Sequence, residues 1–491
     1  MPTRRRRTSF LLVFGLLTCL LAAMPVTAHA RASRSGPGVW TKLATANDAS
    51  DTIGMLRTGD GKLHLVWLNK EASATSHTFG TATLSLAGAK LSSGTAFSHW
   101  DSLEGDPQLV RDGSDFRLVF EGATGSSGCF STGLVYTATS TNGLTFTLAN
   151  NTSMSAASAG IGNLAATVES DGTTPVATFA AGRLFHEGTD SCPAGSDGTI
   201  NNHSGSNVPN NPSIVTDASD GSVWVAWFQT GNTTVGYHVD QILPTELPPV
   251  TAPDSTSTFA ANNQPHQPVA LVARALGGVY MAYCVASSTK PCVHIALWKV
   301  GAPASSVMTV PGSATGTAGH VALAAGKAGR ISVLWYDVGK NLIHAVRTNT
   351  TATAFGVDRT IKPPAHTEAI QDLQGEGTFG RLDVLVNATL TTSGLPSTIQ
   401  QTQILAGLTL TASPKTFANT AAHTVTFTVK DAGQPESGVK VSCAGLSATD
   451  TTNSTGHATL TFPKGFATGQ HVCTASGTDY NPGKVTIKVT H

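Results

Sequence analysis

Residues 59–68, GDGKLHLVWL, decide the fold: a glycine–aspartate turn leads into an alternating apolar strand that ends near an aromatic residue. The pattern returns as DGSDFRLVFE (112–121), SDGTTPVATF (170–179), DGSVWVAWF (220–228), LGGVYMAYC (276–284), AGRISVLWYD (328–337) and FGRLDVLVN (379–387). The steps between the copies are 53, 59, 48, 56, 52 and 51 residues. This spacing suits a repeating unit of four short strands and their loops.

Each repeat also has an apolar first strand before the turn, such as PSIVT (212–216), and several have a third strand, such as NLIHAVRT (341–348). The segment GVWTKLAT (38–45) is typical of an outermost strand that completes the last repeat and closes the ring. We therefore predict an all-β chain in which residues 31–404 form a β-propeller of about seven blades. The seventh copy is the weakest, so six blades with one irregular unit stay possible.

From about Leu405 the pattern changes to short alternating strands at intervals typical of a β-sandwich. Its runs GVKVSC (438–443) and NSTGHATLTF (453–462) resemble those of bacterial immunoglobulin-like modules. The resemblance covers residues 405–491 and implies a spacer or adhesive domain without catalytic residues.

The N-terminus predicts export. Four arginines in MPTRRRRTSF precede an apolar run from Phe10 to about Val26, which closes on the small-residue site Ala28-His29-Ala30. This pattern indicates a cleavable signal peptide over residues 1–30, the alternative being an uncleaved membrane anchor. Charged residues are 12% of the chain and balance to zero, which argues against binding to nucleic acid or an anionic membrane. We expect an extracellular or cell-surface monomer.

Six cysteines follow residue 30, and an even number in an exported chain indicates disulfides. Proximity in the sequence predicts the pairs Cys284 with Cys292, Cys443 with Cys473, and Cys129 with Cys192. The second pair could pin the two sheets of the C-terminal domain together. Spacings typical of zinc sites and motifs for phosphate loops or nucleophilic serines are absent, so we expect no metal and no cofactor.

The sixth repeat and residues 133–146, which include STNGLTF (140–146), resemble the sialidase-like, Asp-box β-propeller superfamily. An Asp-box is a Ser-x-Asp-x-Gly-x-Thr-aromatic turn, and here Asn142 stands near the place of the acid. Because the box lies away from that family's active site, it implies a fold and leaves activity open. A sialidase would also hold a substrate carboxylate with three arginines. Arg57, Arg111 and Arg274 recur in three repeats, but at hairpin turns, where an arginine more often has a structural role.

The opposite rim, where loops lead into the first strands, is the better candidate for a ligand site. The polar and aromatic residues expected there are Asp51, Trp100, Asp101, Asp106, Asn211, His266, Gln267 and His320. An aromatic face stacks on a pyranose while carboxylates and amides bind its hydroxyl groups, so the pattern favours a glycan or a surface protein as ligand. The alternative for each residue is a turn that starts a strand, because Asp or Asn before Pro commonly binds its own backbone.

The sequence leaves three functions open. The first is a recognition protein whose rim binds a glycan or protein. The second is a propeller glycoside hydrolase, because Asp106-Pro107 is similar to the position of the catalytic base in arabinanase-like glycosidases, and Glu187 is the candidate for the second carboxylate. The third is a structural scaffold, which an apolar plug in the ring would favour.

Overall fold

The computed structural model describes residues 37–45, 52–69, 78–97, 102–103, 106–123, 134–153, 162–180, 184–187, 198–201, 208–230, 235–255, 268–287, 290, 292–391 and 397–491. The chain divides into two compact units, Met1–Arg34 and Ser35–His491, and the following concerns the second. Within the described ranges the only helices are two single 3-10 turns, Ala304–Ser306 and Lys327–Gly329. No helix in that part of the chain is long and apolar enough to cross a membrane. The protein is all-β.

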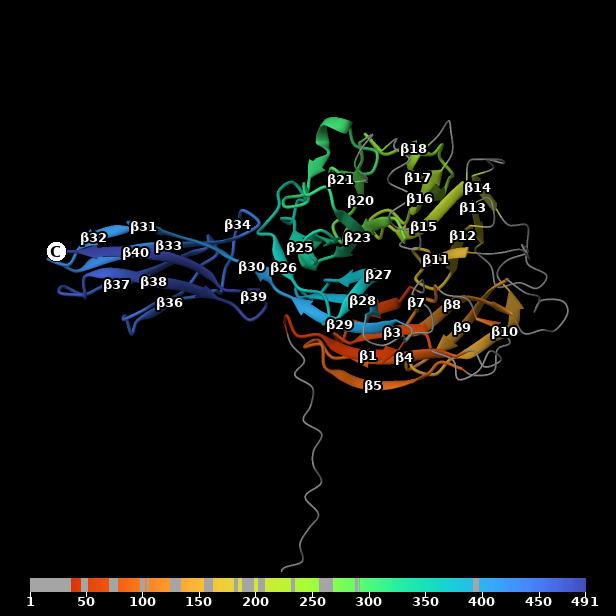
Figure 1. Ribbon diagram of the computed structural model, residues 1–491, viewed down its shortest axis with the longest axis horizontal. Coiled ribbons are helices and arrows are strands. Elements are labelled where there is room, and N and C mark those ends of the chain that lie inside the picture. Colours follow the sequence, from red (N-terminus) through yellow and green to blue (C-terminus); the bar gives the residue numbers. More distant parts are fainter. Residues whose placement is uncertain are drawn as a thin grey trace, which may run out of the picture. The chain divides into compact units, whose positions relative to one another are not determined.

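The described residues up to Ile404 form seven antiparallel sheets (Figure 1). The first has β2 (Gly54–Arg57), β3 (Leu63–Leu68), β4 (Phe79–Leu84) and β5 (Lys90–Thr95). The second has β6 (Ser102–Leu103), β7 (Gln108–Asp112), β8 (Asp115–Ala123), β9 (Leu134–Ser140) and β10 (Thr147–Ser153). The third has β11 (Gly162–Val168), β12 (Pro175–Ala180), β13 (Leu184–Glu187) and β14 (Gly198–Asn201). The fourth has β15 (Val208–Thr216), β16 (Val223–Thr230), β17 (Gly236–Leu243) and β18 (Val250–Thr251).

The fifth sheet has β19 (Ala270–Ala273), β20 (Val279–Val285), β21 (His294–Lys299) and β22 (Met308–Thr309). The sixth has β23 (Ala318–Ala325), β24 (Ile331–Asp337), β25 (Leu342–Arg347) and β26 (Arg359–Ile361). The seventh has β27 (Thr367–Glu376), β28 (Leu382–Leu390), β29 (Thr398–Ile404) and, at its outer edge, β1 (Thr41–Thr45). The pairing of β1 with β29 confirms that the segment before the first repeat completes the last sheet. Each aromatic-ended run that marks a repeat is the second strand of its sheet.

The apolar cores lie between the sheets. One cluster joins the first and second sheets through Val66 and Phe120, and another joins the fifth and sixth through Leu297 and Trp335. Further clusters connect the remaining neighbours, including the seventh sheet with the first, where Leu385 packs in one cluster with Leu65 and Trp67. Strands such as β3 are therefore buried on both faces, which explains their nearly continuous apolar sequence. Because the last sheet packs on the first, the sheets close into a ring, as in a β-propeller.

The Asp-box-like turn joins β9 to β10. The Ser140 hydroxyl accepts a hydrogen bond from the Gly143 N–H (2.9 Å), and Asn142 Oδ1 accepts bonds from the N–H groups of Leu144 (2.8 Å) and Thr145 (3.0 Å). Phe146 then enters the core between the first and second sheets. Asn142 thus holds this turn with its side-chain amide oxygen.

Residues after Ile404 form two further sheets around one core of their own. One contains β31 (Thr409–Ser413), β33 (His423–Asp431), β34 (Gln434–Pro435) and β37 (His457–Phe462). The other contains β32 (Thr416–Ala418), β35 (Lys440–Cys443), β36 (Thr449–Thr451), β38 (Gly469–Ser476) and β40 (Gly483–Thr490). Strands β30 (Ala406–Gly407) and β39 (Tyr480–Asn481) pair in parallel beside them. Buried and exposed residues alternate strictly along β37, as one-sided burial requires.

The disulfides Cys284–Cys292 and Cys443–Cys473 are present as predicted, whereas Cys129 and Cys192 lie outside the described residues. The expected role of Cys443–Cys473 was wrong. Cys443 on β35 is directly opposite Cys473 on β38, so the bond connects two strands of one sheet. Side chains directly opposite on paired strands have Cβ atoms ~5 Å apart, whereas packed sheets are ~10 Å apart.

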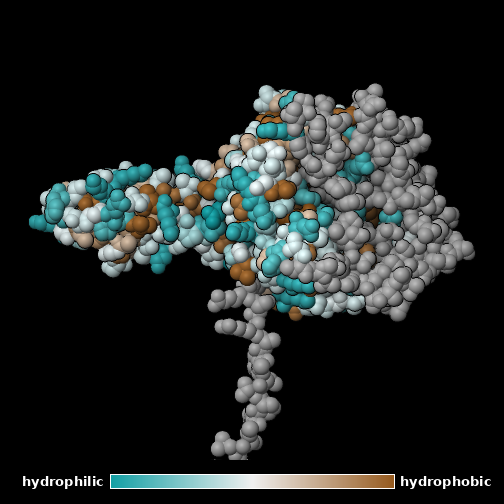
Figure 2. Space-filling view, in the orientation of Figure 1, coloured by the Kyte–Doolittle hydropathy of each residue, from teal (hydrophilic) through white to brown (hydrophobic). Residues whose placement is uncertain are grey.

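The described surface in Figure 2 mixes hydrophilic and hydrophobic residues over short distances. Exposed large apolar side chains of the described residues, such as Leu276 and Val338, lie in loops of different sheets. Single exposed apolar residues of this kind are normal on soluble proteins and do not by themselves mark a docking surface.

Candidate functional site

The seven first strands surround a central channel. A cavity of about 200 Å³ in it is lined by residues of all seven strands: Met55, Gln108, Ala165, Ala166, Ser213, Ile214, Val215, Pro268, Val269, Ala270, Leu271, Val321, Ala322, Leu323, Leu373, Gln374 and Gly375. Most of the lining is apolar, and its polar side chains are Gln108, Ser213 and Gln374. The interior of the channel therefore offers few groups that could bind a polar ligand or react with it. The polar groups that could do so lie at the two ends of the channel.

The two ends of the channel differ. At one end are the hairpins that connect each first strand to its second strand, and neighbouring hairpins contact each other, as when Gly278 N–H donates to Asp217. The other end, here called the channel mouth, is where the chain enters the first strands. Asp106, Asn211 and His320 all lie there, one or two residues before the channel-lining residues that follow them. The structure thus brings three of the predicted residues to one end of one channel.

These three residues share an unusual backbone conformation. Their φ angles are 72° for Asp106, 53° for Asn211 and 47° for His320, in the left-handed region that L-residues other than glycine seldom adopt. A break in strand register spans Asn211, between Asn210 and Ser213, and another spans His320, between Gly319 and Ala322. Bulges of this type re-aim a side chain and recur beside functional sites.

A second carboxyl group lies beside Asp106. Asp106 Oδ1 accepts a bond from the Thr52 N–H (3.3 Å), and Asp372 Oδ2 accepts one from the next amide, that of Ile53 (3.2 Å). Asp372 Oδ2 also accepts a bond from Gln374 Nε2 (2.8 Å). Both carboxyl groups thus hold the start of β2, and Asp106 and Asp372 come from the second and seventh sheets.

Asp372 is 1% exposed, and burial raises its pKa to about 7. The donors Gln374 and Ile53 act against this rise, and the neighbouring Asp106 carboxylate adds to it. His320 shifts in the other direction, because burial lowers its pKa to about 4. At neutral pH burial therefore favours the uncharged form of both the His320 imidazole and the Asp372 carboxyl group.

Sequence reasoning missed Asp372. A signal was present, because AIQDLQGEG (369–377) places an acid inside a first strand where the other repeats have mainly apolar residues. The signal was hidden because the seventh repeat departs most from the pattern, and its first strand was not assigned.

The remaining predicted residues divide into two groups. Asp51, Trp100, Asp101, His266 and Gln267 lie outside the described residues. Glu187 ends β13, the third strand of its sheet, so that β12 separates its backbone from the channel strand β11. The backbone arrangement gives no support to a pairing of Glu187 with Asp106, and Asp372 replaces it in the candidate site.

The three arginines considered for an anionic ligand lie towards the hairpin end. Arg57 is buried and forms ion pairs with Glu376 and Asp383. Arg111 donates to the Arg57 carbonyl (3.4 Å), whereas Arg274 binds the carbonyls of Gly277 (3.1 Å) and Thr350 (3.1 Å). These contacts are structural, which agrees with the hairpin interpretation. Among the described residues, no group of three or more His, Cys, Asp or Glu is placed to hold a metal ion.

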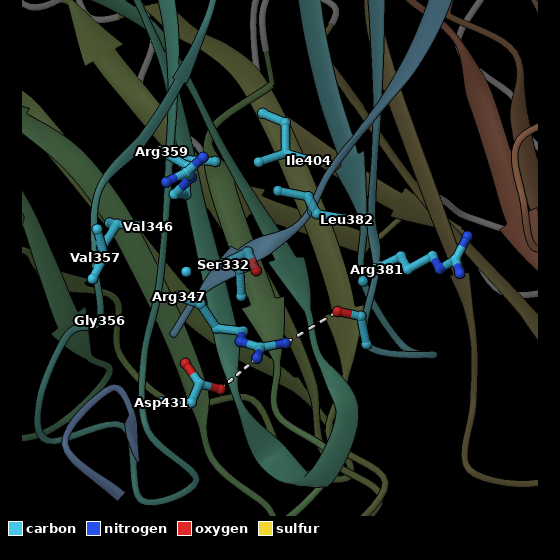
Figure 3. A pocket seen from close by; sticks show the side chains of 15 residues that line it. Ser332, Val346, Arg347, Gly356, Val357, Arg359, Arg381, Leu382, Ile404 and Asp431 are labelled. Atoms are coloured by element: carbon cyan, nitrogen blue, oxygen red, sulfur yellow. Dashed lines mark hydrogen bonds and ion pairs between the residues drawn. The ribbon is translucent and has the colours of Figure 1, made fainter. Parts of the chain in front are cut away.

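Polar contacts join the hairpin end to the C-terminal sheets (Figure 3). Asp431, 1% exposed at the end of β33, accepts a hydrogen bond from Arg347 and forms an ion pair with Arg330 (3.2 Å). Arg347 also donates to the Gly380 carbonyl (3.0 Å). The pocket around Arg347 holds only about 20 Å³. A neighbouring cavity of about 400 Å³ contains Arg330 opposite Glu436, at 3.9 Å. Because these charges face each other, we interpret this region as a structural junction.

Replacing Asp431 with asparagine should lower the free energy of unfolding by about 2 kcal/mol, because it leaves two largely buried guanidinium groups without their shared carboxylate. Urea denaturation followed by tryptophan fluorescence measures the effect. The control is Asp479→Asn, which removes the partner of Arg381 (2.8 Å) at a 42% exposed carboxyl group. That change should cost less than about 1 kcal/mol. Equal losses in both variants would contradict the special role of Asp431.

No protein-family model and no curated protein matches this chain. Solved structures that match include the polysaccharide lyase Uly1, AofleA from Arthrobotrys oligospora and an exo-β-1,3-galactanase from Phanerochaete chrysosporium with galactose. Their sequence identities are 9%, 10% and 12%, and their TM-scores are 0.43, 0.38 and 0.32. The matches cover 77%, 74% and 78% of this chain and 94%, 87% and 94% of those chains. At these values, what those proteins act on does not carry over to this chain.

Proposed function

We propose that this chain is an exported glycan-recognition protein: a seven-bladed β-propeller that binds its ligand at the channel mouth, followed by an immunoglobulin-like domain over residues 405–491. The two described disulfides are compatible with an oxidising, extracellular location. The balanced charge and the mixed polar surface suit a monomer that does not bind nucleic acid.

One observation carries the proposal. Three different sheets each place a polar side chain, from Asp106, Asn211 and His320, at the channel mouth from a left-handed backbone position. Such a conformation costs a non-glycine residue roughly 1 kcal/mol or more. Glycine would adopt it without that cost, and this chain uses glycine at many other left-handed positions. A function of the side chains themselves would explain why these three positions do not have glycine. A carboxylate, an amide and an imidazole around one opening can each bind sugar hydroxyl groups.

The test uses the same backbone argument. In Asn211→Gly and His320→Gly the left-handed conformation stays available while the side chain is removed. We expect both variants to fold and to lose at least tenfold in affinity for glycans that the wild type retains on a glycan array. The matched control is Ala328→Gly, because Ala328 (φ 58°) has the same left-handed backbone but lies at the hairpin end. The glycan affinity of this control variant should stay unchanged. If the wild type binds no glycan, the proposal fails and the scaffold interpretation replaces it.

A second candidate function is glycoside hydrolysis, favoured by the Asp106 and Asp372 pair. Such hydrolysis requires two carboxyl groups, one as a proton donor and one as a base or nucleophile, and the raised pKa of Asp372 suits the proton donor. Release assays on fluorogenic glycosides decide between the two functions. Turnover that disappears in Asp106→Asn and survives in the control Asp254→Asn would establish the hydrolase, whereas binding without turnover would leave the pair as a binding element.

A further inference from the structure

The channel of the ring has apolar walls that are only partly covered. Its cavity of about 200 Å³ is lined by residues of all seven first strands, and no charged residue is among the lining residues that the structure describes. Four apolar side chains of the lining, those of Met55, Ala166, Val215 and Leu323, are only half-buried. Protein interiors contain few voids larger than a water molecule. Apolar walls around a water-filled space are therefore unfavourable, and an apolar occupant would be stabilised there.

Two of the polar side chains in the lining are bound to the protein itself. Gln108 Nε2 donates to the Asp106 carbonyl (3.3 Å), and Gln374 Nε2 donates to the Asp372 carboxyl group (2.8 Å). The channel therefore has few groups left for the hydroxyl groups of a sugar. The three polar residues of the channel mouth, by contrast, come directly before the lining residues in the chain. A ligand that spans both places needs a polar part and an apolar part.

The cavity is longer than it is wide. Residues 268–271 line it in four successive positions, which corresponds to roughly 10 Å of channel at ~3.3 Å per residue. Residues 321–323 and 373–375 line it in three successive positions each. Apolar cavities of about 150 Å³ already bind benzene, so the volume here is sufficient for an apolar group. Spread over that length, the volume suits an extended chain more than a broad ring system.

Contacts between neighbouring hairpins hold the walls of the channel in place. The Gly113 N–H of the second sheet donates to the Gly172 carbonyl of the third (2.8 Å). The Gly278 N–H of the fifth sheet donates to Asp217 of the fourth (2.6 Å). A cavity with walls fixed in this way is formed before the ligand arrives, so that little of the binding free energy is lost in ordering the protein.

We propose that the channel binds the apolar part of an amphiphilic glycoside: the sugar lies at the channel mouth, and an unbranched alkyl group attached to it enters the channel. This inference rests on the proposed function and names its ligand class. The polar residues at the mouth bind hydroxyl groups, whereas the uncharged walls of the channel favour methylene groups over water.

The experiment measures the affinity of the purified protein at pH 7 for β-D-glucosides with methyl, butyl and hexyl groups, and for 1-hexanol, by isothermal titration calorimetry. Burial of one methylene group raises affinity roughly three- to fourfold. We expect hexyl glucoside to bind at least thirtyfold more tightly than methyl glucoside. It should also bind at least tenfold more tightly than 1-hexanol, which has the same alkyl group without the sugar.

Two variants test whether the alkyl group lies in the channel. Leu323→Gln places an amide of similar size in the lining, and Ala166→Met narrows the channel. Each should lower the affinity for hexyl glucoside at least fivefold and that for methyl glucoside less than twofold. The matched control is Leu56→Gln, because Leu56 is also a half-buried leucine of a first strand but packs between the first and second sheets. This control should bind hexyl glucoside as the wild type does, and thermal unfolding identifies the variants that are folded.

Equal affinities for the three glucosides would mean that water or a segment of this chain holds the channel, and they overturn the inference while leaving glycan recognition intact. A gain with chain length that is unchanged in both channel variants also overturns it. If 1-hexanol binds as tightly as hexyl glucoside, the sugar contributes nothing and the amphiphilic ligand is excluded. If no glucoside binds and a glycan array is empty as well, it is the proposed function that fails.

Discussion

Replacing Arg57 with methionine should lower the free energy of unfolding by about 3 to 5 kcal/mol, the largest effect we expect from a single substitution. Arg57 is the only cation among the described residues that pairs with Glu376 and Asp383, and it also donates to the Gly61 carbonyl (2.8 Å). Its removal leaves two carboxyl groups without a counter-charge where the first sheet meets the seventh. Burial already raises the pKa of Asp383 to about 6 while Arg57 is present.

Urea denaturation of the wild type and the variant measures this loss. Arg111→Met is the matched control, because within the described part of the chain the Arg111 guanidinium donates one long bond, to the Arg57 carbonyl (3.4 Å). The cost of that change should stay below about 1 kcal/mol. Adding Glu376→Gln and Asp383→Asn to Arg57→Met should restore part of the stability, because the buried charges are then removed together. A loss of under about 1 kcal/mol for Arg57→Met would show that this ion cluster does not hold the ring closed.

The second large effect is a pH dependence that Asp372 imposes on stability. Its pKa in the folded protein, about 7, is above the ordinary value of 3.8, so the folded state holds this proton more tightly than the unfolded state does. The stabilisation is fully present below about pH 4 and is lost as the pH rises to about 7. Over that window the contribution of this group amounts to about 4 kcal/mol at most.

The comparison of wild type with Asp372→Asn isolates this contribution from other titrating groups, such as His320, whose lowered pKa acts in the opposite direction. Asparagine resembles the protonated acid, since its carbonyl oxygen can accept from Ile53 and Gln374. The variant should be close to the wild type at pH 4.5 and more stable than it at pH 8. Thermal unfolding at half-unit pH steps gives the difference curve, and a curve that is flat between pH 4 and 8 would contradict the buried, protonated state of Asp372.

The sequence alone predicted the second strand of each sheet in the ring and the closure of the ring. In each of the seven sheets of the ring, the second strand follows a Gly or Asp turn and carries the apolar run that predicted it. A strand packed between two neighbouring sheets must be apolar on both faces. The segment at 38–45 could be placed in the last sheet because a ring cannot leave an unpaired edge. The partners in the two described disulfides, Cys284–Cys292 and Cys443–Cys473, followed from proximity in the chain.

Only the tertiary structure decided what the polar residues do. Arg57 and Asp383 are 326 residues apart in sequence, and no local pattern shows that the ring brings them into contact. The same holds for Asp106 and Asp372, whose carboxyl groups accept hydrogen bonds from the adjacent amides of Thr52 and Ile53, just before the first sheet. Strands and turns can be predicted from a few neighbouring residues in the sequence. The partner of a buried charge instead depends on how the first and last sheets pack together in the folded chain. The sequence therefore predicted the ring and its mouth, and only the structure showed which charged and polar side chains lie next to one another.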